Sequence, residues 1–464
     1  MKRHFGAVIR VVTLAFVAAC SSISTDTGST EVPVPRSSWL AQGLPVHTRL
    51  SATKDSIVYG GVGQTGFYVV ALDPTTGKER WREASDMSGR SNWKEPSILT
   101  DGDTAYFLAG RHSGIALVAV ATETGKERWR TGLVGESAEP AISCGNAICV
   151  VVSRCACERG WSLPRKEMWR FSKADGTLLS QHLLAADVGN QEVVLSVDSS
   201  NDADTTVLLA SFGQAVYITR FDHFGEKMAW AKPVPDLFGP TPVDPKSGWD
   251  SQRVAGGWVV SLARKDRTVG EITPGEVLQS GAVTRIDDDG KVGWVAADRD
   301  MCGMIFDSTT DKPLCDGDIR ILSAEEYERR PNVVEGRDTT TGGVKWRLDL
   351  QGEIDEAKPG EKIVRIDENR YLVGLTRGRV MIDLRHGLES TPNEEPTGWC
   401  TPDRKLDKIG FGVARSYPRA SNPFPCRLGG NHVEPSLPIP KFAGVTVAGW
   451  GAWVEDGQVH AKRQ

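Results

Sequence analysis

The 464-residue chain lacks the motifs of several common functional classes. It has no block of Lys and Arg, so a nucleic-acid partner is not expected. It has no His-Glu-x-x-His motif, phosphate-binding glycine loop or Gly-x-Ser-x-Gly elbow, which are signatures of zinc, nucleotide and serine-hydrolase sites. No apolar run after residue 19 is long enough to cross a bilayer. We therefore predict no catalytic residue, no metal ligand and no cofactor-binding residue.

Residues 1–19 are predicted to be a signal peptide. A basic start precedes an apolar run that is too short for a stable membrane-spanning helix. Val17-Ala18-Ala19-Cys20 resembles a bacterial lipobox, in which the cysteine is lipidated. An ordinary secretory signal with an incidental cysteine is the alternative. Acyl chains on Cys20 would anchor the protein in membrane lipid.

Residues 20–38 contain the expected lipidation site and then a segment rich in Ser, Thr and Pro without aromatic residues. Such a segment cannot bury enough surface to fold, so we expect a disordered tether. The remaining residues, 39–464, are expected to form one domain. The whole chain has 49 Gly, 25 Pro and 14 Trp, a composition typical of turn-rich all-β proteins.

One local pattern recurs along the chain. Ala71–Trp81, Ala119–Trp129 and Gly336–Trp346 each contain Thr-Gly, with Trp four residues after the Gly. Glycine permits a positive φ in a turn, Asp and Thr can bond turn amides, and Trp can cap a sheet. The best-matching positions are Asp73, Gly77, Trp81, Gly125, Trp129, Asp338, Gly342 and Trp346. A repeat of 40 to 50 residues is typical of four-stranded propeller blades.

Weaker copies of the pattern end at Ser180, Trp230, Trp294 and Thr391, which makes seven repeats. An eighth is implied because residues 444–461 read as three short strands without their last partner. Trp39, near the N-terminus, would supply that partner strand. We therefore expect an all-β, closed β-propeller of four-stranded blades. Eight blades are favoured over seven, with the N-terminal strand completing the last blade and removing a free edge.

The recurring pattern resembles the tryptophan-docking motif of the pyrroloquinoline-quinone-like (PQQ-like) repeat family, and the resemblance covers nearly all of residues 39–464. It implies a propeller in which each Trp packs between neighbouring blades. Quinone-dependent dehydrogenases of this type hold their cofactor against an adjacent Cys-Cys disulfide. Here Cys155 and Cys157 are separated by Ala156, and no Cys-x-x-Cys-His haem site is present. We therefore expect no cofactor.

Eight cysteines remain if Cys20 is lipidated, and an even number in an exported protein favours disulfides. Gly145-Asn146 is a type I′ hairpin signal that would place Cys149 diagonally from Cys144 on one sheet face. The alternative joins Cys144 to Cys157 and Cys149 to Cys155. A soft metal at Cys155 and Cys157 is a further alternative. Proximity in sequence suggests the pairs Cys144 with Cys149, Cys155 with Cys157, Cys302 with Cys315, and Cys400 with Cys426.

Other polar and aromatic features are assigned to the scaffold or to its surface. Asp287-Asp288-Asp289-Gly290 matches no EF-hand loop and stands where the other repeats have a turn, so a turn is expected in place of a calcium site. Trp161 and Trp399 adjoin cysteines in loop-like segments and are better candidates for a contact surface than Trp450 or Trp453.

The expected function is that of a non-enzymatic scaffold or binding protein. The chain is similar to the propeller lipoprotein family of outer-membrane β-barrel assembly, which implies an envelope protein partner. The expected location is the extracytoplasmic face of the cell membrane or the outer membrane, through a lipid anchor. A quinone- or metal-binding propeller enzyme and a small-ligand sensor are the alternatives.

Overall fold

The computed structural model describes residues within the compact unit Ser37–Gln464. The predicted signal peptide, Cys20 and residues 20–36 of the predicted tether lie outside the described residues. The described residues are 37–63, 66–85, 98–111, 114–132, 137–138, 141–154, 165–184, 192–199, 206–212, 215–224, 226–241, 243, 249–262, 277–278, 281–301, 312–321, 327–349, 363–375, 377–392, 394–400, 406–409, 415–418 and 422–464.

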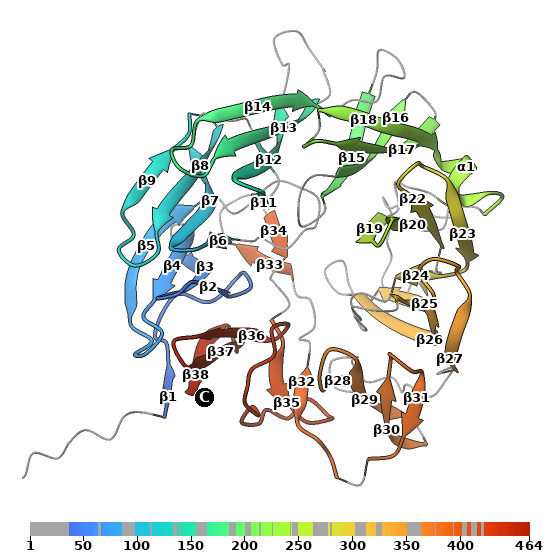
Figure 1. Ribbon diagram of the computed structural model, residues 1–464. Coiled ribbons are helices and arrows are strands. Elements are labelled where there is room, and N and C mark those ends of the chain that lie inside the picture. The colour runs from blue at the N-terminus through green and yellow to red at the C-terminus, as the bar shows by residue number, and fades with distance from the viewer. Residues whose placement is uncertain are drawn as a thin grey trace, which may run out of the picture. The chain divides into compact units, whose positions relative to one another are not determined.

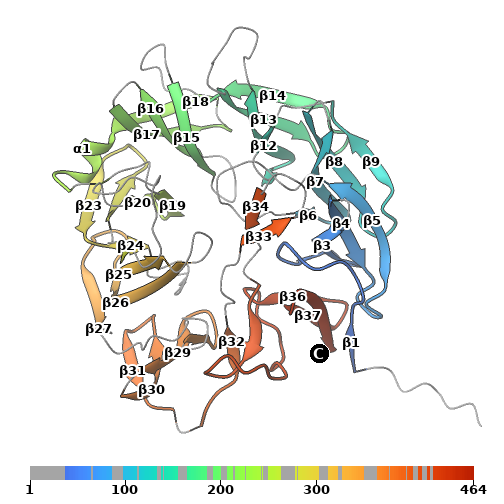
Figure 2. The same cartoon turned by 180° about the vertical axis from the view of Figure 1, so that it is seen from behind.

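The described strands form antiparallel sheets arranged around a common centre, with successive strands running from the centre outwards (Figure 1). The view from behind shows the same arrangement (Figure 2). These residues contain five four-stranded sheets, two five-stranded sheets, one six-stranded sheet and one separate hairpin. The predicted all-β propeller is therefore confirmed. The chain alternates short apolar strands with Gly-, Asp- and Thr-rich turns, which favours such meandering sheets.

We number the sheets in chain order. Sheet 1 contains β2 (Ser51–Ala52), β3 (Ile57–Gly63), β4 (Gly66–Leu72) and β5 (Glu79–Ser85). Sheet 2 contains β6 (Leu99–Asp101), β7 (Thr104–Arg111), β8 (Gly114–Ala121) and β9 (Glu127–Arg130). Sheet 3 contains β10 (Ser137–Ala138), β11 (Ile142–Cys144), β12 (Ala147–Arg154), β13 (Arg165–Ser172) and β14 (Leu178–Leu183). Sheet 4 contains β15 (Glu192–Ser199), β16 (Thr206–Phe212), β17 (Ala215–Asp222) and β18 (Lys227–Pro233).

The later sheets are less regular. Sheet 5 contains β19 (Trp249–Val254), β20 (Gly257–Leu262), β22 (Ala282–Asp287) and β23 (Val292–Ala297). Sheet 6 contains β21 (Val277–Leu278), β24 (Asp300–Met301), β25 (Lys312–Ile321), β26 (Tyr327–Arg337) and β27 (Val344–Asp349). Sheet 7 contains β28 (Ile363–Arg365), β29 (Arg370–Leu375), β30 (Gly378–Asp383), β31 (Leu388–Ser390), β32 (Gly398–Cys400) and β35 (Phe424–Cys426). Sheet 8 contains β36 (Gly444–Val447), β37 (Trp450–Glu455), β38 (Gln458–Arg463) and β1 (Ser38–Leu40).

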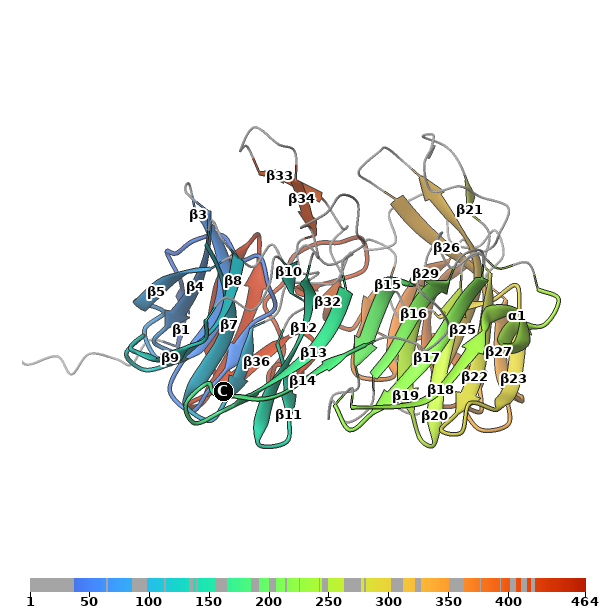
Figure 3. The ribbon, with the colours of Figure 1, turned by 90° about the horizontal axis from the view of Figure 1, so that it is seen from above.

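Two elements lie outside this scheme. The separate hairpin pairs β33 (Leu406–Ile409) with β34 (Arg415–Pro418) and extends beyond the neighbouring sheets on one side (Figure 3). The short helix α1 (Val234–Phe238) follows β18 and buries Val234, Leu237 and Phe238. No helix among the described residues is long and apolar enough to cross a membrane.

The strand β1 comes from the N-terminal end of the described chain and pairs with β38 from its C-terminal end. Trp39 stands opposite Ala461, just as Trp81 stands opposite Ala71 in sheet 1. Ala41 extends this pairing, since its amide donates to the carbonyl of Val459 at 2.9 Å. The outermost strand of sheet 8 is thus a segment of the N-terminal region.

The recurring turn is built as its residue types suggest. In sheet 1, a carboxylate oxygen of Asp73 accepts hydrogen bonds from the backbone amides of Thr75 and Thr76 at 2.9 and 3.0 Å. Gly77 follows at φ +69°, a left-handed conformation that suits glycine. The register shifts by a bulge between Ala71 and Leu72, which places Trp81 opposite Ala71.

Each tryptophan at a docking position contacts the turn of the next sheet. The indole Nε1 of Trp81 donates to the carbonyl of Thr122 at 2.8 Å, and that of Trp129 donates to Lys173 at 3.0 Å. A Cβ atom on Gly125 would lie 2.6 Å from the Trp81 ring, so only glycine permits this close approach. Trp39, Trp230 and Trp294 donate equivalent bonds to the carbonyls of Pro74, Asp288 and Thr339. Trp346 packs closely against Gly387 of the next sheet, as Trp81 packs against Gly125.

The structure corrects one expected motif position. Thr391 was predicted at the tryptophan position of sheet 7, but β31 ends at Ser390, and Ser390 is the residue opposite Met381. The hairpin of β30 and β31 pairs without the bulge seen in the other repeats, so its residues stand one place earlier. Ser180, by contrast, does occupy the tryptophan position of sheet 3, opposite Arg170 and next to the bulge.

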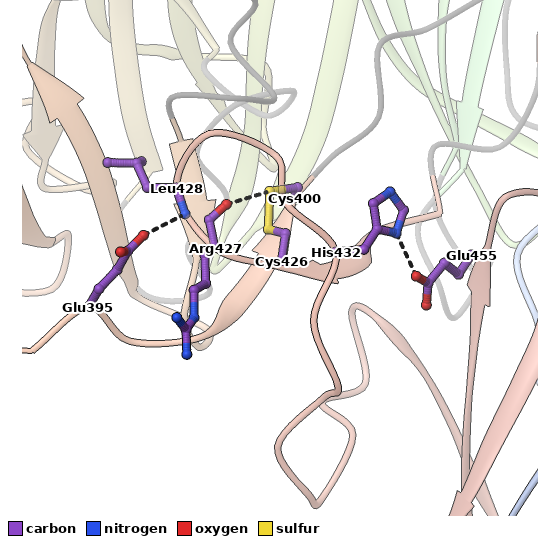
Figure 4. The surroundings of a disulfide bond; sticks show 7 residues. All are labelled: Glu395, Cys400, Cys426, Arg427, Leu428, His432 and Glu455. Atoms are coloured by element: carbon purple, nitrogen blue, oxygen red, sulfur yellow. Dashed lines mark hydrogen bonds and ion pairs between the residues drawn. A yellow bond between two sulfur atoms is a disulfide. The ribbon is translucent and has the colours of Figure 1, made fainter.

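Two disulfides are present among the described cysteines, and both join the pairs favoured by sequence proximity. Cys144–Cys149 has a Cα–Cα distance of 5.8 Å, and Cys144 pairs with Ala147 across the hairpin. Gly145 has φ +66°, but Asn146 is not a positive-φ residue, so the predicted type I′ turn is wrong. Cys400–Cys426 joins β32 to β35 (Figure 4). Cys155, Cys157 and Cys302 lie outside the described residues, as does the side chain of Cys315.

Candidate partner-binding edge

The outermost strand of each sheet has one edge that no other described strand pairs with. A free edge offers backbone N–H and C=O groups to another chain, and proteins usually protect such edges with charged side chains. Four of the outermost strands follow this rule. Their charged residues are Glu79, Arg80, Arg82 and Glu83 in β5, Glu127, Arg128 and Arg130 in β9, Lys227 and Lys232 in β18, and Lys345, Arg347 and Asp349 in β27.

The outermost strand of sheet 3, β14, departs from this rule. Its sequence, Leu-Leu-Ser-Gln-His-Leu, has no Asp, Glu, Lys or Arg. Leu178, Leu179 and Leu183 are 46%, 49% and 46% exposed, so much of their apolar surface faces solvent. β14 pairs with β13 from Leu178 to Leu183, and its other edge has no partner among the described strands. It therefore combines a free backbone edge with exposed leucines.

The comparison with β23 shows what distinguishes β14. β23 is also free of charged residues, and Val295 is its single large exposed apolar residue. However, α1 packs beside this strand and buries its own apolar residues near it, whereas no described helix lies beside β14 (Figure 1). An uncovered, uncharged edge with three exposed leucines is a template for another strand.

A pocket of about 280 Å³ opens next to the start of β14, where sheets 2 and 3 meet. Its apolar lining comes from the aromatic side chains of sheet 3 and from Leu178, and its polar lining comes from the end of β9 and the turn before β14. The lining residues are Arg130, Thr131, Gly132, Trp169, Phe171, Asp175, Gly176, Thr177 and Leu178. The pocket could receive one large side chain of a chain bound along β14.

Hydrogen bonds hold the side chains near this pocket in place. Glu167 accepts from Trp169 Nε1 at 2.7 Å and from Gln181 Nε2 at 2.6 Å, which links β13 to β14. Asp175 accepts from the amide and hydroxyl of Thr177 at 3.2 and 2.8 Å. Hydrogen bonds from Ser172 and Thr177 lower the pKa of the Asp175 carboxyl. Asp175 is therefore an ionised turn residue at neutral pH, not a proton donor.

The acidic residues of the recurring pattern also serve their turns. Burial alone would raise the pKa of Asp73, but hydrogen bonds from Thr75, Arg80 and Thr76 outweigh burial and hold it well below its ordinary range. Backbone amides of Thr341 and Thr340 lower the pKa of Asp338 in the same manner. Asp288 faces the guanidinium groups of Arg253 and Arg220, which also lower its pKa. The expected turn at Asp287–Gly290 is observed, with Asp287 accepting from the amides of Asp289 and Lys291.

A buried carboxylate in sheet 6 is likewise part of the scaffold. The side chain of Glu335 is 1% exposed and bonds Arg299 at 2.9 Å and Arg337 at 2.6 Å. Burial would raise the pKa of Glu335, but the bonds from the two arginines outweigh burial, and the pKa is lowered. Within the described parts of the chain, no three His, Cys, Asp or Glu side chains come together as a metal site.

Trp161 and Trp399 are the two tryptophans considered for a contact surface. Trp399 is 5% exposed and packs with Ile439, Ala443 and Trp453, so its assignment to a contact surface is wrong. A disulfide and a β-bridge partner fix the strand that carries it, and its ring turns into the core. Trp161 lies outside the described residues.

The tryptophan pattern alone does not reveal the β14 edge. Ser180 stands at a docking-tryptophan position, and its neighbours in β14 are leucine-rich and include no Asp, Glu, Lys or Arg. The equivalent residues of β5 and β9 include charged side chains, as in Glu79–Arg82 and Glu127–Arg130. A comparison of charge between outer strands selects β14 together with β23 and β1, and the three leucines of β14 distinguish it from those two strands.

The fold and its docking tryptophans define a β-propeller that resembles the PQQ-like repeat type. A family model described as outer membrane protein assembly factor BamB matches residues 65–224, which confirms the predicted resemblance. No curated protein matches the chain.

Solved propellers are similar at low identity. BamB from Moraxella catarrhalis is 16% identical, with 77% of this chain and 99% of that chain covered and a TM-score of 0.30. A europium-containing methanol dehydrogenase is 10% identical, with 79% and 84% covered and a TM-score of 0.41. Kuenenia stuttgartiensis hydrazine synthase is 13% identical, with 74% and 78% covered and a TM-score of 0.36. At these identities and TM-scores the likenesses carry no conclusion about function.

Proposed function

We propose that the protein is a non-enzymatic scaffold that binds an extended segment of an envelope protein along β14. The observation that carries this proposal is the uncharged, uncovered edge of β14 with Leu178, Leu179 and Leu183 exposed beside a pocket. The printed description of the matching family, an outer membrane protein assembly factor, supports a scaffold role in the envelope.

A bound segment would add a strand to sheet 3. Its backbone would satisfy the free donors and acceptors of β14, which gives affinity that depends little on sequence. Its alternate side chains would pack on Leu179 and Leu183, and a large residue near Leu178 would enter the pocket. Because β14 carries no charge, apolar or neutral side chains are favoured at these positions.

The platform that presents this edge is proposed to be an eight-bladed ring formed by residues 39–464. The pairing of β1 with β38 and the bond from Trp39 to Pro74 support closure between sheets 8 and 1. Residues 1–19 would serve as a lipoprotein signal, and acylated Cys20 with the tether would hold the ring at the extracytoplasmic face of a membrane.

The proposal is tested by site-specific crosslinking in the native host. A photoreactive amino acid at Gln181, an exposed position in β14, should crosslink to one defined envelope protein. The double variant Leu179→Lys/Leu183→Lys should abolish that adduct, since it places charge on the edge. The control Val344→Lys places one lysine at a 50%-exposed apolar position on β27 and should leave the adduct unchanged. Equal adduct yields from the wild type and the β14 variant would overturn the proposal.

A further inference from the structure

Tryptophan docking does not occur at every joint between sheets. Docking residues stand between sheets 8 and 1, 1 and 2, 2 and 3, 4 and 5, 5 and 6, and 6 and 7. The two remaining joints follow Ser180 of sheet 3 and Ser390 of sheet 7. We call these joints seam 3/4 and seam 7/8. In a ring of eight sheets the two seams stand opposite each other.

Seam 3/4 is packed in a different way from the docked joints. Cys149, Arg170 and Ser180 are direct cross-strand partners, so they share one face of sheet 3. The Arg170 guanidinium lies 4.6 Å from the centre of the Phe224 ring, which belongs to the turn of sheet 4. The Cys144–Cys149 disulfide is buried in a cluster that contains Met168 and Leu184 and also Phe221, which belongs to sheet 4. At this joint, packing of the disulfide-containing part of sheet 3 therefore takes the place of a docking tryptophan on the outermost strand.

Seam 7/8 lies next to the second disulfide, which stiffens the inner edge of sheet 7. β32 and β35 extend sheet 7 from β28, and the Cys400–Cys426 bond joins them. Both cysteines are fully buried against Val364 and Leu372 of sheet 7. Two contacts link this region to sheet 8. Trp399 of β32 packs with Trp453. Nδ1 of His432, which follows Cys426 in the chain, lies 2.5 Å from a carboxylate oxygen of Glu455 (Figure 4).

Both disulfides of the described chain therefore lie at the two joints without a docking tryptophan. We propose that the ring consists of two four-sheet halves, sheets 8, 1, 2 and 3 and sheets 4, 5, 6 and 7. Docking tryptophans hold each half together, and disulfide-stiffened packing holds the halves to each other. The seams are the places where the ring opens. The inference rests on the proposed eight-bladed ring and is independent of the proposed partner.

Native-state hydrogen exchange on the intact, oxidised protein tests the inference directly. Amides of a half that lie away from the seams should share one opening event. Amides of β13 and β17 at seam 3/4, with those of β35 and β37 at seam 7/8, should open at lower denaturant concentration than the rest of their halves. Docked joints such as Trp81 to Thr122 should open only with their whole half. A single opening event for the whole of Ser37–Gln464, or a docked joint that opens first, would overturn the inference.

Variants that each lack one disulfide show which seam that disulfide stabilises. Cys144→Ala/Cys149→Ala and Cys400→Ala/Cys426→Ala should each raise exchange roughly tenfold or more at their own seam and leave the docked joints within about twofold. The matched control Trp294→Phe loosens a joint inside one half and should leave both seams unchanged. Uniform acceleration in all sheets would contradict two halves.

The same experiment distinguishes a failure of this inference from a failure of the proposed closed ring. The amide of Ala41 bonds Val459 and reports the pairing of β1 with β38. Fast exchange of Ala41 in the wild type would refute the closed ring, whereas slow exchange with one uniform opening event would refute the two halves alone. No partner is present in these measurements, so they do not depend on binding at β14.

Discussion

Trp39 donates a 3.0 Å hydrogen bond from its indole Nε1 to the carbonyl of Pro74, although the two residues belong to different sheets. Trp39 stands on β1, which pairs with the last strand of the chain, and Pro74 stands in the turn of sheet 1. The indole is 7% exposed and also packs beside Trp450, with ring centroids 6.2 Å apart. A single side chain therefore contacts segments from both ends of the described chain.

Replacing Trp39 by Ala should lower the free energy of unfolding by about 3–5 kcal/mol, because a buried indole and its hydrogen bond are lost. Chemical denaturation followed by circular dichroism measures this change. The control Leu40→Ala removes the adjacent side chain, which is 48% exposed, and should change stability by no more than about 0.5 kcal/mol. A loss for Trp39→Ala as small as that for Leu40→Ala would show that the indole contributes little to the ring.

Replacing Gly125 by Ala should destabilise sheet 2 by two additive effects. Its φ of +70° strains any L-residue by about 1–2 kcal/mol, and the new Cβ would meet the Trp81 ring at 2.6 Å, adding about 1–3 kcal/mol. Gly102→Ala is the matched control in the same sheet. Gly102 has φ +59° and open space around it, so only the backbone strain applies. Equal melting temperatures for the two variants would contradict the tryptophan contact.

Replacing Asp73 by Asn should lower the melting temperature at pH 7 and lower it less at pH 2. The folded pKa of Asp73 is depressed, so its stabilisation is present above the unfolded value of about 3.9 and is lost as the pH falls towards the folded value. The residue is only partly buried, so the loss should not exceed about 1 kcal/mol. Asp289→Asn, at an exposed side chain, is the control and should leave the melting temperature at pH 7 unchanged. A loss as large at pH 2 as at pH 7 would refute the charge argument.

Replacing Cys20 by Ser should release the protein from membranes if acyl chains are its anchor. Fractionation of host cells, with metabolic labelling by a fatty acid, measures both association and lipidation. Ser22→Ala serves as the control and should leave both unchanged. Membrane association that persists without the label would indicate another means of attachment.

The repeated turn was predictable because each of its residues has a local physical role. Gly77, Gly125 and Gly342 meet the need for a positive φ, and Asp73 and Asp338 bond the turn amides nearest to them. These requirements act over a few residues, so they are visible in one sequence. The local pairs Cys144–Cys149 and Cys400–Cys426 were predictable for a related reason, since each joins neighbouring strands.

Other features depend on contacts between segments that are distant in sequence. Trp399 looks like a loop residue, but it is buried because Ile439 and Trp453 pack against it. The exposed edge of β14 is defined by the lack of a neighbouring element among the described residues, and a local pattern does not report such a lack.

The direction of tryptophan docking has a consequence for synthesis. Each indole belongs to the earlier sheet, and the carbonyl that accepts its hydrogen bond belongs to the later one, as for Trp81 and Thr122 or Trp129 and Lys173. A newly made sheet thus lacks this contact until the next sheet has been synthesised. β1 differs from the other outermost strands, because it is made first and obtains its strand partner, β38, last. β1 therefore has no native strand partner until β38 has been synthesised.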